Sequence, residues 1–275
     1  MFSTFKDKTI VITGGATGIG FSLAKQFVAD GANVVIGEPR QHRLDEAVAV
    51  LNAMTGGAVG IVTDVTDPAS VEALADFAEA TFGPVDIAIN NAGVAQRTRA
   101  KLTDTDLEDM RHVFDVNLFG VWYGCGTFGR RMMKRDAQAA IYNVASENSL
   151  FLATVRASAY IASKHAVHGL TDAFREEMPD HVHVGAIFPG WVASELMPPE
   201  VRQYAMDADE FAGKVVEQIR AGETHIVTHA FNIERIRARQ AEIEAAYAKW
   251  APRYDGDDEF DVRTVLARLR EGNAG

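Results

Sequence analysis

The sequence predicts an α/β protein with one doubly wound parallel sheet of about seven strands and helices on both faces. Short runs rich in valine and isoleucine alternate with longer segments of helical periodicity over most of the chain. The short runs are apolar almost throughout, which is typical of strands that are buried on both faces. Because crossovers between parallel strands are right-handed, this alternation places helices on both sides of the sheet.

Seven strands are expected, and each except the last is followed by a helix. A glycine-rich turn separates the first strand, TIVIT, from its helix. Before the third helix, Thr66-Asp67-Pro68 provides a cap and a proline, which suits the first helical turn because its missing N–H has no partner there. The expected strands span residues 9–13, 33–38, 58–65, 85–90, 139–146, 181–188 and 225–229, and the expected helices span residues 21–29, 44–54, a segment from residue 68, 113–133, a segment around Tyr160, and 209–220.

The alternation of strands and helices ends after residue 230. Apolar residues then recur near helical spacing among charges over residues 233–250, which predicts an amphipathic helix, and a last helix is expected over residues 262–270. We therefore expect one main domain over residues 1–229 and a helical extension over residues 230–275. The extension is expected to pack on this domain or on a neighbouring subunit, and a lid over a ligand site is the alternative.

The composition restricts the partners and the compartment of the protein. A formal net charge of −11 over 275 residues argues against nucleic acid or an anionic membrane as a partner. We see no apolar run long enough to span a bilayer and no secretory signal, and the single cysteine, Cys125, cannot form an intrachain disulfide. The eight histidines lack the spacing of a metal motif. We expect a cytoplasmic protein that binds no metal, no nucleic acid and no membrane.

The turn after the first strand carries the first candidate ligand site. The segment TGGATGIG has its glycines in the spacing Gly-xxx-Gly-x-Gly. Glycine allows positive φ and a close approach of the backbone to a pyrophosphate, and the N-terminus of the next helix attracts an anion. The predicted contacts to a dinucleotide phosphate are Gly14, Thr17, Gly18, Ile19 and Gly20. A glycine-rich turn without a ligand is the alternative.

Acidic residues at the ends of the second and third strands predict how the nucleoside is held. Glu38 ends the second strand, where a carboxylate can accept hydrogen bonds from both ribose hydroxyls and repel a 2′-phosphate. This favours NAD over NADP. Arg40 follows two residues later and could bind a 2′-phosphate, so NADP stays open as the less favoured cofactor. Asp64 and Val65, at the end of the third strand, are expected to contact adenine.

Polar residues also follow the fourth and fifth strands and interrupt one helix. Asn91, Ala92 and Gly93 end the fourth strand, where an amide side chain braces the sheet and small residues leave room for a cofactor. Asn117 lies among Val, Leu and Phe in a helical segment. Because asparagine disfavours helix interiors, we expect a specific partner for its amide. Ser146 ends the fifth strand, with its hydroxyl expected to face the ligand crevice.

Tyr160 and Lys164 give the strongest indication of catalysis. They lie four residues apart in a helical segment, so their side chains share one face. At roughly 5 Å and an effective dielectric near 20, the lysine cation favours the ionised phenol by about 3 kcal/mol, which lowers the pKa of the tyrosine by about two units. Such a phenol suits general acid/base catalysis. Ser146 is the preferred third member and Ser149 the alternative, and an ordinary helix surface is the alternative for the pair alone.

These motifs occur in an order that resembles the short-chain dehydrogenase/reductase family. The order TGxxxGxG, NNAG, Asn, Ser, YxxxK and PG extends over residues 8–229. The resemblance implies a Rossmann-type dinucleotide-binding catalytic domain in which Tyr160 is the general acid/base, while Lys164 lowers its pKa and holds the nicotinamide ribose. It also implies that Ser146 orients and polarises the substrate oxygen, and that Asn117 holds a water that relays protons through Lys164.

The resemblance adds cofactor contacts after the sixth strand and includes two departures. The groups implied to fix the nicotinamide carboxamide lie at Pro189, Gly190, Val192 and Ser194. Tyr160 and Lys164 are implied as further cofactor contacts. Ser146 precedes Tyr160 by fourteen residues where thirteen is usual in the family, so we expect one extra residue to bulge in the intervening loop. Ser194 replaces the more common threonine and keeps the hydroxyl.

The sequence therefore predicts an NAD-dependent oxidoreductase that interconverts a secondary alcohol and a ketone by hydride transfer. Trp191, Leu196 and Met197, with two adjacent prolines, predict a pocket for an apolar or aromatic substrate. Polar substrate contacts are expected from Gln96, Arg97, Glu147 and Asn148. The alternatives are an NADPH-dependent carbonyl reductase, a dinucleotide-sensing protein without turnover, and a lyase or epimerase that retains NAD. The resemblance also implies a homotetramer or homodimer, built through the helices at residues 113–133 and around Tyr160.

Overall fold

The structure is a computed structural model that describes residues 2–54, 57–197 and 199–272. The chain divides into two compact units, Met1–Ala230 and Phe231–Gly275. Of the two adjacent prolines expected in the substrate pocket, Pro199 is described, and Pro198 lies outside the described residues.

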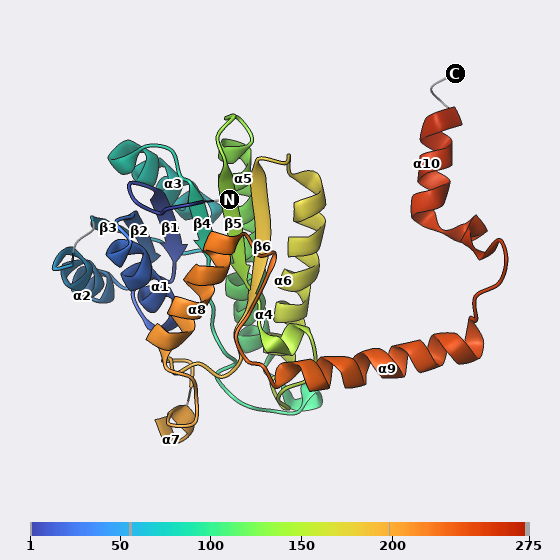
Figure 1. Ribbon diagram of the computed structural model, residues 1–275. Coiled ribbons are helices and arrows are strands. Elements are labelled where there is room, and N and C mark those ends of the chain that lie inside the picture. Colours follow the sequence, from blue (N-terminus) through green and yellow to red (C-terminus); the bar gives the residue numbers. More distant parts are fainter. Residues whose placement is uncertain (1, 55–56, 198, 273–275) are drawn as a thin grey trace. The chain divides into compact units, whose positions relative to one another are not determined.

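The first unit is built on a parallel sheet (Figure 1). The strands are β1 (Thr9–Thr13), β2 (Asn33–Glu38), β3 (Ala58–Val62), β4 (Ile87–Asn90), β5 (Ala139–Val144), β6 (Val182–Phe188) and β7 (His225–Val227). They lie in the order β3-β2-β1-β4-β5-β6-β7, and each neighbouring pair is parallel. Because β1 lies between β2 and β4, the strand order reverses there, which confirms the predicted doubly wound sheet.

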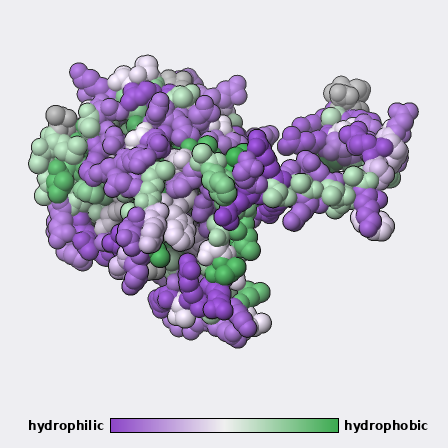
Figure 2. All heavy atoms as spheres, turned by 60° about the horizontal axis from the view of Figure 1, so that its bottom comes forward, coloured by the Kyte–Doolittle hydropathy of each residue, from purple (hydrophilic) through white to green (hydrophobic). Residues whose placement is uncertain are grey.

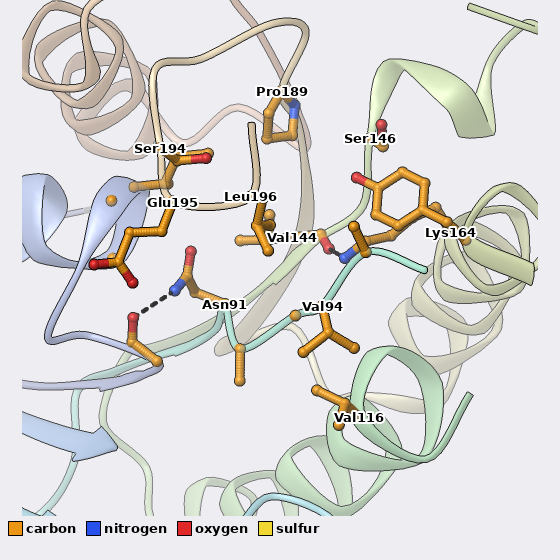
Figure 3. A pocket seen from close by; sticks show the side chains of 18 of the residues that line it. Asn91, Val94, Val116, Val144, Ser146, Lys164, Pro189, Ser194, Glu195 and Leu196 are labelled. Atoms are coloured by element: carbon orange, nitrogen blue, oxygen red, sulfur yellow. Dashed lines mark hydrogen bonds between the residues drawn. The ribbon is translucent and has the colours of Figure 1, made fainter. Parts of the chain in front are cut away.

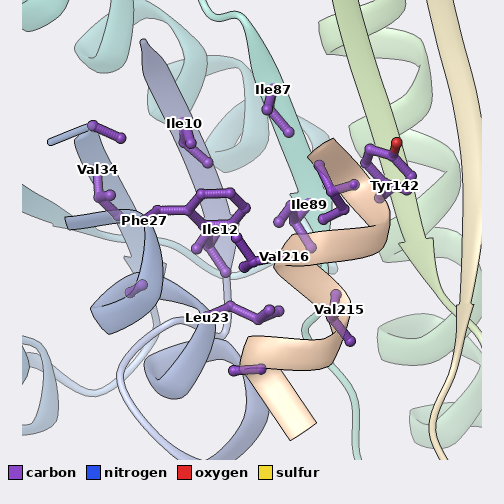
Figure 4. Close-up of a cluster of buried hydrophobic side chains, with 14 of the residues drawn as sticks. Ile10, Ile12, Leu23, Phe27, Val34, Ile87, Ile89, Tyr142, Val215 and Val216 are labelled. Carbon is purple, nitrogen blue, oxygen red and sulfur yellow. The ribbon is translucent and has the colours of Figure 1, made fainter. Parts of the chain in front are cut away.

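Helices cover both faces of this sheet. They are α1 (Gly18–Ala29), α2 (Gln41–Asn52), α3 (Pro68–Phe82), α4 (Leu107–Phe114), α5 (Gly120–Met132), α6 (Ser158–Glu177), α7 (Pro199–Arg202) and α8 (Ala208–Ala221). One hydrophobic core joins α1, α2 and α8 to the sheet, and a second joins α3, α5 and α6 to the opposite face. Successive side chains of β1 point to opposite faces, so Ile10 and Ile12 enter the first core (Figure 4) and Val11 enters the second.

Several strand boundaries differ from the prediction. β3 ends at Val62 instead of residue 65, β5 at Val144 instead of residue 146, and β7 at Val227 instead of residue 229, while β4 and β6 begin later, at Ile87 and Val182. The end of β3 follows from its ladder, because the partner strand β2 ends at Glu38, opposite Val62. The candidate residues expected at the ends of β3 and β5 therefore lie in loops, directly beyond the carboxyl edge of the sheet.

The helical stretch expected over residues 113–133 is present and contains one wider turn. α4 ends at Phe114, a wider π-helical turn follows as η2 (Asp115–Phe119), and α5 begins at Gly120. Asn117 lies in this turn and bonds to the segment after β4. A π turn inside a helix is common at functional sites, where it changes the direction of a side chain.

The second unit is helical, as predicted. It contains α9 (Asn232–Trp250), the short turn η4 (Asp257–Phe260) and α10 (Val262–Gly272). The surface on which this unit packs, whether its own domain or a neighbouring subunit, stays a prediction.

Hydrophilic side chains cover most of the face in Figure 2, and hydrophobic ones gather in smaller patches. Throughout the described ranges, no helix combines the length and the apolar character that crossing a bilayer requires. The cytoplasmic location and the oligomeric state stay predictions.

Candidate active site

A cavity of about 1110 Å³ lies at the carboxyl edge of the sheet. Loops that follow each strand from β1 to β6 contribute to its lining. The predicted site residues that line it are Gly14, Thr17, Gly18, Ile19, Gly20, Glu38, Asp64, Val65, Asn91, Ala92, Gly93, Gln96, Arg97, Ser146, Glu147, Asn148, Tyr160, Lys164, Pro189, Gly190, Trp191, Val192, Ser194, Leu196 and Met197. This is the position where open α/β sheets bind ligands, next to the reversal of strand order. The remaining predicted residue, Asn117, does not line the cavity.

The glycine turn after β1 combines left-handed backbone with very close packing. Gly14 and Gly18 have φ values of +62° and +53°, a region that favours glycine. A Cβ at Gly20 would lie 2.4 Å from the carbonyl oxygen of Gly14 and 2.5 Å from Nδ2 of Asn91. Thr17 is the N-cap of α1, and its side chain does not cap the helix. The first N–H groups of α1 are therefore left without a side-chain acceptor at the edge of the cavity.

Asn91 fastens the segment after β4 to the glycine turn. Its Nδ2 donates to the carbonyl oxygens of Thr13 and Gly14 at 2.9 and 3.1 Å, and one of its hydrogen bonds is drawn in Figure 3. Thr13 Oγ1 in turn accepts from the backbone N–H groups of Asn91 and Ala92. Thr13 was not among the predicted site residues, because a threonine at a strand end has no distinctive local pattern.

Asn117 has specific partners but lies behind the cavity wall. Its side chain is fully buried, Oδ1 accepts from the N–H of Val94 at 2.8 Å, and Nδ2 donates to the Val94 carbonyl at 3.0 Å. Nδ2 also lies 3.1 Å from Oγ of Ser163 on α6. The amide therefore ties η2 to the segment after β4 and to α6. A water held by Asn117 stays a prediction.

Ser146, Tyr160 and Lys164 meet at one end of the cavity. Lys164 is 3% exposed, and its Nζ donates to the carbonyl of Val144 at 2.7 Å and lies 5.9 Å from the centre of the Tyr160 ring. Ser146 and Tyr160 both line the cavity, and Ser146 lies close enough to lower the pKa of the Tyr160 phenol. Figure 3 shows Ser146 and Lys164 on one side of the cavity and Ser194 on the other. The loop after β5 and the helix α6 thus bring the three groups together.

Ser149, the alternative to Ser146, has a different environment. It ends the short turn η3 (Glu147–Ser149), does not line the cavity, and donates its hydroxyl to the carbonyl of Ser146. The extra residue expected between Ser146 and Tyr160 does not keep either of them from lining the cavity. In the intervening loop, Arg156 has a φ of +60°, an uncommon conformation for a residue other than glycine.

Burial controls the ionisation of both groups on α6. It raises the pKa of Tyr160, a hydrogen bond from Ser146 opposes this rise, and the charge of Glu147 adds to it. Burial also lowers the pKa of Lys164 to about 8. Burial therefore outweighs the other causes, and the pKa of Tyr160 lies above its ordinary value, whereas the pair of residues led us to expect a pKa below it.

Comparison with known proteins identifies the family. Residues 8–205 match the family model described as short chain dehydrogenase. The chain belongs to the short-chain dehydrogenase family. This agrees with the resemblance seen in the order of the motifs, and it covers the part of the chain from β1 to the loop after α7.

Several relatives of this short-chain dehydrogenase have known activities or structures. The chain is 32% identical over 200 residues to 3alpha-hydroxysteroid dehydrogenase of Mediterraneibacter gnavus, covering 72% of this chain and 78% of the relative. It is 38% identical over 187 residues to galactitol 2-dehydrogenase (L-tagatose-forming) of Cereibacter sphaeroides, and this match covers 67% of this chain and 71% of the relative. The fold is similar to that of a short-chain dehydrogenase/reductase of Burkholderia phymatum crystallised with NAD, with a TM-score of 0.82 and 29% identity. The superposition covers 90% of this chain and 97% of the other.

Membership in the family establishes the class of reaction. This short-chain dehydrogenase is an oxidoreductase that acts on a hydroxyl or keto group and binds a nicotinamide dinucleotide. The residues present fit such a cofactor, because any side chain at Gly20 would collide with the glycine turn and the N-terminus of α1 faces the same space. The turn can thus accept a pyrophosphate against its backbone.

At the end of β2, beside the cavity of the dehydrogenase, a buried carboxylate is paired with an arginine. Glu38 is 2% exposed, and its Oε1 accepts from Nε of Arg40 at 2.6 Å. Nη1 of Arg40 also lies 3.2 Å from the carboxylate of Glu195, in the segment after β6, and Nη2 of Arg43 lies 3.1 Å from the same carboxylate. The hydrogen bond with Glu38 is the main cause that raises the pKa of Arg40. The charge of Arg40 is therefore balanced by two carboxylates.

Gln96 has a role that the sequence did not indicate. It lines the cavity of the dehydrogenase, as predicted for a substrate contact, but its Oε1 also accepts from the N–H groups of Ala159 and Tyr160 at 2.9 and 3.4 Å. These N–H groups lie in the first turn of α6, where they have no acceptor within the helix. The N-cap of α6, Ala157, provides no side-chain acceptor for them either. Asp109, also unpredicted, accepts from the N–H of Arg97 and holds the same loop. Local sequence carries no sign of either contact.

Proposed function

We propose that this dehydrogenase is an NAD-dependent oxidoreductase that interconverts a secondary alcohol and a ketone, with Tyr160 as the general acid/base. The observation that supports this most directly is the meeting of Ser146, Tyr160 and Lys164 in one cavity with the glycine turn after β1. A phenol inside a dinucleotide cavity, between a hydroxyl and a buried amine, is arranged for proton transfer at the substrate oxygen.

Each of the three groups has a separate task in this proposal. In the oxidation direction, Tyr160 accepts the hydroxyl proton of the substrate, and the Ser146 hydroxyl donates to the same oxygen. Lys164 has a pKa of about 8, so it is mostly protonated at neutral pH and stabilises the phenolate form of Tyr160. When bound, the nicotinamide ring supplies the hydride acceptor in oxidation and the donor in reduction. Positioning by β5 and α6 then accounts for much of the rate.

We assign NAD as the cofactor on electrostatic grounds. The buried carboxylate of Glu38 would repel a 2′-phosphate, and Arg40 already has Glu38 and Glu195 as partners. The competing proposal, an NADPH-dependent carbonyl reductase, requires Arg40 to leave these partners. A comparison of kcat/KM for the two cofactors decides between them, and a strong preference for NADPH would overturn the assignment.

We assign an apolar or aromatic secondary alcohol as the substrate class. Trp191 and Leu196 line the cavity and stay largely exposed, so they have apolar surface to offer. Glu147 and Asn148 are buried beside Ser146 and provide polar contacts within the same cavity. The relatives named above act on substrates as different as a hydroxysteroid and galactitol, so a panel of secondary alcohols that includes aryl alcohols and cyclic diols is the direct test.

The proposed assembly is a homotetramer or homodimer. Phe119 and Trp122 expose apolar side chains where η2 meets α5, the helical stretch predicted to form a subunit contact. Sedimentation equilibrium of the full chain gives the oligomeric state, and a monomer at micromolar concentration would reject this assembly.

The substitution Tyr160→Phe tests the catalytic assignment. We expect kcat to fall by about 10²-fold or more while NADH binding is retained, because the ring stays and only the proton-transferring hydroxyl is lost. Tyr247→Phe, on α9, is the matched control and should leave kcat unchanged. Near-normal turnover by the Tyr160 variant would reject the assignment. Binding of NADH by the wild type without turnover of any alcohol in the panel would favour the dinucleotide-sensing alternative.

A further inference from the structure

We propose that His168, Asp172 and His225 form a binding site for one divalent transition-metal ion of the zinc type. Their ligand atoms all lie within 4.8 Å of one another. None of the three lines the cavity described above. The site joins the catalytic helix α6, which carries His168 and Asp172, to the strand β7, which carries His225.

The helix supplies two ligands at a separation that suits a metal ion. His168 and Asp172 are four residues apart and therefore share one helical face. Nε2 of His168 lies 3.5 Å from Oδ2 of Asp172. Two ligand atoms that are each about 2.1 Å from a tetrahedral ion lie about 3.4 Å apart, so this pair already has the required spacing. His225 reaches the same point because β7 pairs with β6, with His225 opposite Ala186.

The aromatic ring of Phe188 orients both imidazoles. The His168 ring meets it edge-on, with 4.9 Å between the ring centres. The His225 ring stacks on it, with 5.9 Å between the ring centres and an interplanar angle of 7°. The centres of the two histidine rings are 6.2 Å apart. Phe188 is itself 2% exposed, so it is held firmly by the core. The rings are thus largely arranged before an ion arrives, and a small rotation of the exposed His225 side chain can complete the contact.

An arginine holds one of the helix-borne ligands from behind. Arg175 donates to the other carboxylate oxygen of Asp172, Oδ1, at 2.9 Å. Such outer contacts fix the orientation of metal ligands. The positive charge of Arg175 also opposes a cation, so we expect moderate affinity. An ordinary ion pair of Asp172 with His168 and Arg175 is the competing explanation for the cluster.

The ligand set determines the kind of ion. Two imidazoles with one carboxylate suit Zn²⁺, Co²⁺ or Ni²⁺, whereas Mg²⁺ and Ca²⁺ prefer oxygen ligands alone. A bound ion would cross-link α6 to β7, which has only three residues and pairs with β6. We therefore expect the ion to stabilise this side of the fold without taking part in the reaction.

Metal titration of the full chain, purified without a polyhistidine tag and treated with a chelator, tests the proposal. Calorimetry with Zn²⁺ should give one bound ion per chain with a Kd in the micromolar range, and Zn²⁺ should raise Tm. His225→Gln should weaken binding by about tenfold or more and abolish the rise in Tm. Because His225 is exposed, this variant should fold. His42→Gln removes another exposed imidazole, on α2, and should bind like the wild type.

Two further measurements complete the test. Co²⁺ should give visible d–d absorption typical of four- or five-coordination in the wild type and in His42→Gln, and this absorption should be lost in His225→Gln and in Asp172→Asn. Absence of bound Zn²⁺ in the wild type would overturn the proposal. Equal Zn²⁺ affinity of the wild type and His225→Gln would overturn it as well, because the ion would then be bound elsewhere.

Discussion

The two ends of the cavity differ in how they are built. At the dinucleotide end, where we propose that the cofactor phosphates bind, the turn after β1 offers closely packed backbone and lacks side chains, as the close contacts around Gly20 show. At the reaction end, β5 and α6 place ionisable side chains, above all Lys164, where water is excluded. Substitutions at the first end should therefore act by steric conflict at any pH, whereas substitutions at the second end should act through charge and depend on pH.

Gly20→Ala should have the largest effect and shows the steric character of the first end. The new Cβ would meet the backbone oxygen of Gly14, which cannot move without displacing the turn. We expect the free energy of unfolding to fall by about 3 kcal/mol and dinucleotide binding to weaken by about 10²-fold. Gly213→Ala, in the middle of α8 with open space around it, is the matched control and should be neutral or slightly stabilising.

Chemical unfolding and fluorescence titration with NADH measure these two quantities. If Gly20→Ala behaved like Gly213→Ala in both, close packing would not be the basis of recognition at this end.

Lys164→Met should reveal the electrostatic character of the second end as a dependence on pH. Lys164 has a folded pKa of about 8 against 10.5 as its ordinary value. Below about pH 8 it is protonated in both states, and burial of the charge costs about 3 kcal/mol. Between pH 8 and 10.5 the unfolded chain binds more protons than the folded one, so the stability of the wild type relative to the variant should rise by about this amount.

Urea unfolding of both proteins across this pH range, without cofactor, gives the difference directly. Groups common to the two proteins cancel in it. A difference that stays constant with pH would show that Lys164 is not desolvated in the folded protein.

Glu38→Ser should change cofactor preference at the dinucleotide end, where one side chain does act through charge. Loss of the carboxylate removes a ribose acceptor and frees Arg40 for a 2′-phosphate. We expect the ratio of kcat/KM for NAD to that for NADP to fall by about thirtyfold, or about 2 kcal/mol. Glu46→Gln, an exposed residue of α2, is the control. An unchanged ratio would contradict the role of Glu38.

Gln96→Met should have the smallest effect, and it tests the contact between the loop after β4 and the start of α6. It removes the acceptor for the N–H groups of Ala159 and Tyr160, which should lower stability by about 1 kcal/mol, as for the loss of a helix cap. If the cap positions Tyr160, kcat should fall more than KM rises. Gln240→Met on α9 is the control. Equal stability and equal kcat for Gln96→Met and the wild type would show that other contacts hold the start of α6.

The features of the dinucleotide end were easier to predict than those of the reaction end, because the sequence pattern that indicates them lies within a short segment. The glycines of the turn occur within seven residues of one another, and their spacing alone predicts a tight turn before a helix. Tyr160 and Lys164 were equally visible as a helical pair. The directions in which their pKa values shift were not visible in the sequence, because desolvation depends on the segments folded around the two side chains. Exact strand ends, such as that of β3, depended on the length of the partner strand.

Local patterns were sufficient to predict the doubly wound sheet, the strand that each motif follows and most residues that line the cavity. Contacts between distant segments came only with folding. Gln96 caps a helix that begins more than sixty residues later, and His225 approaches Asp172 across more than fifty residues. The reason is physical: periodicity and glycine spacing act over a few residues, whereas such pairings depend on how β6 and β7 align and on how the loop after β4 packs against α6.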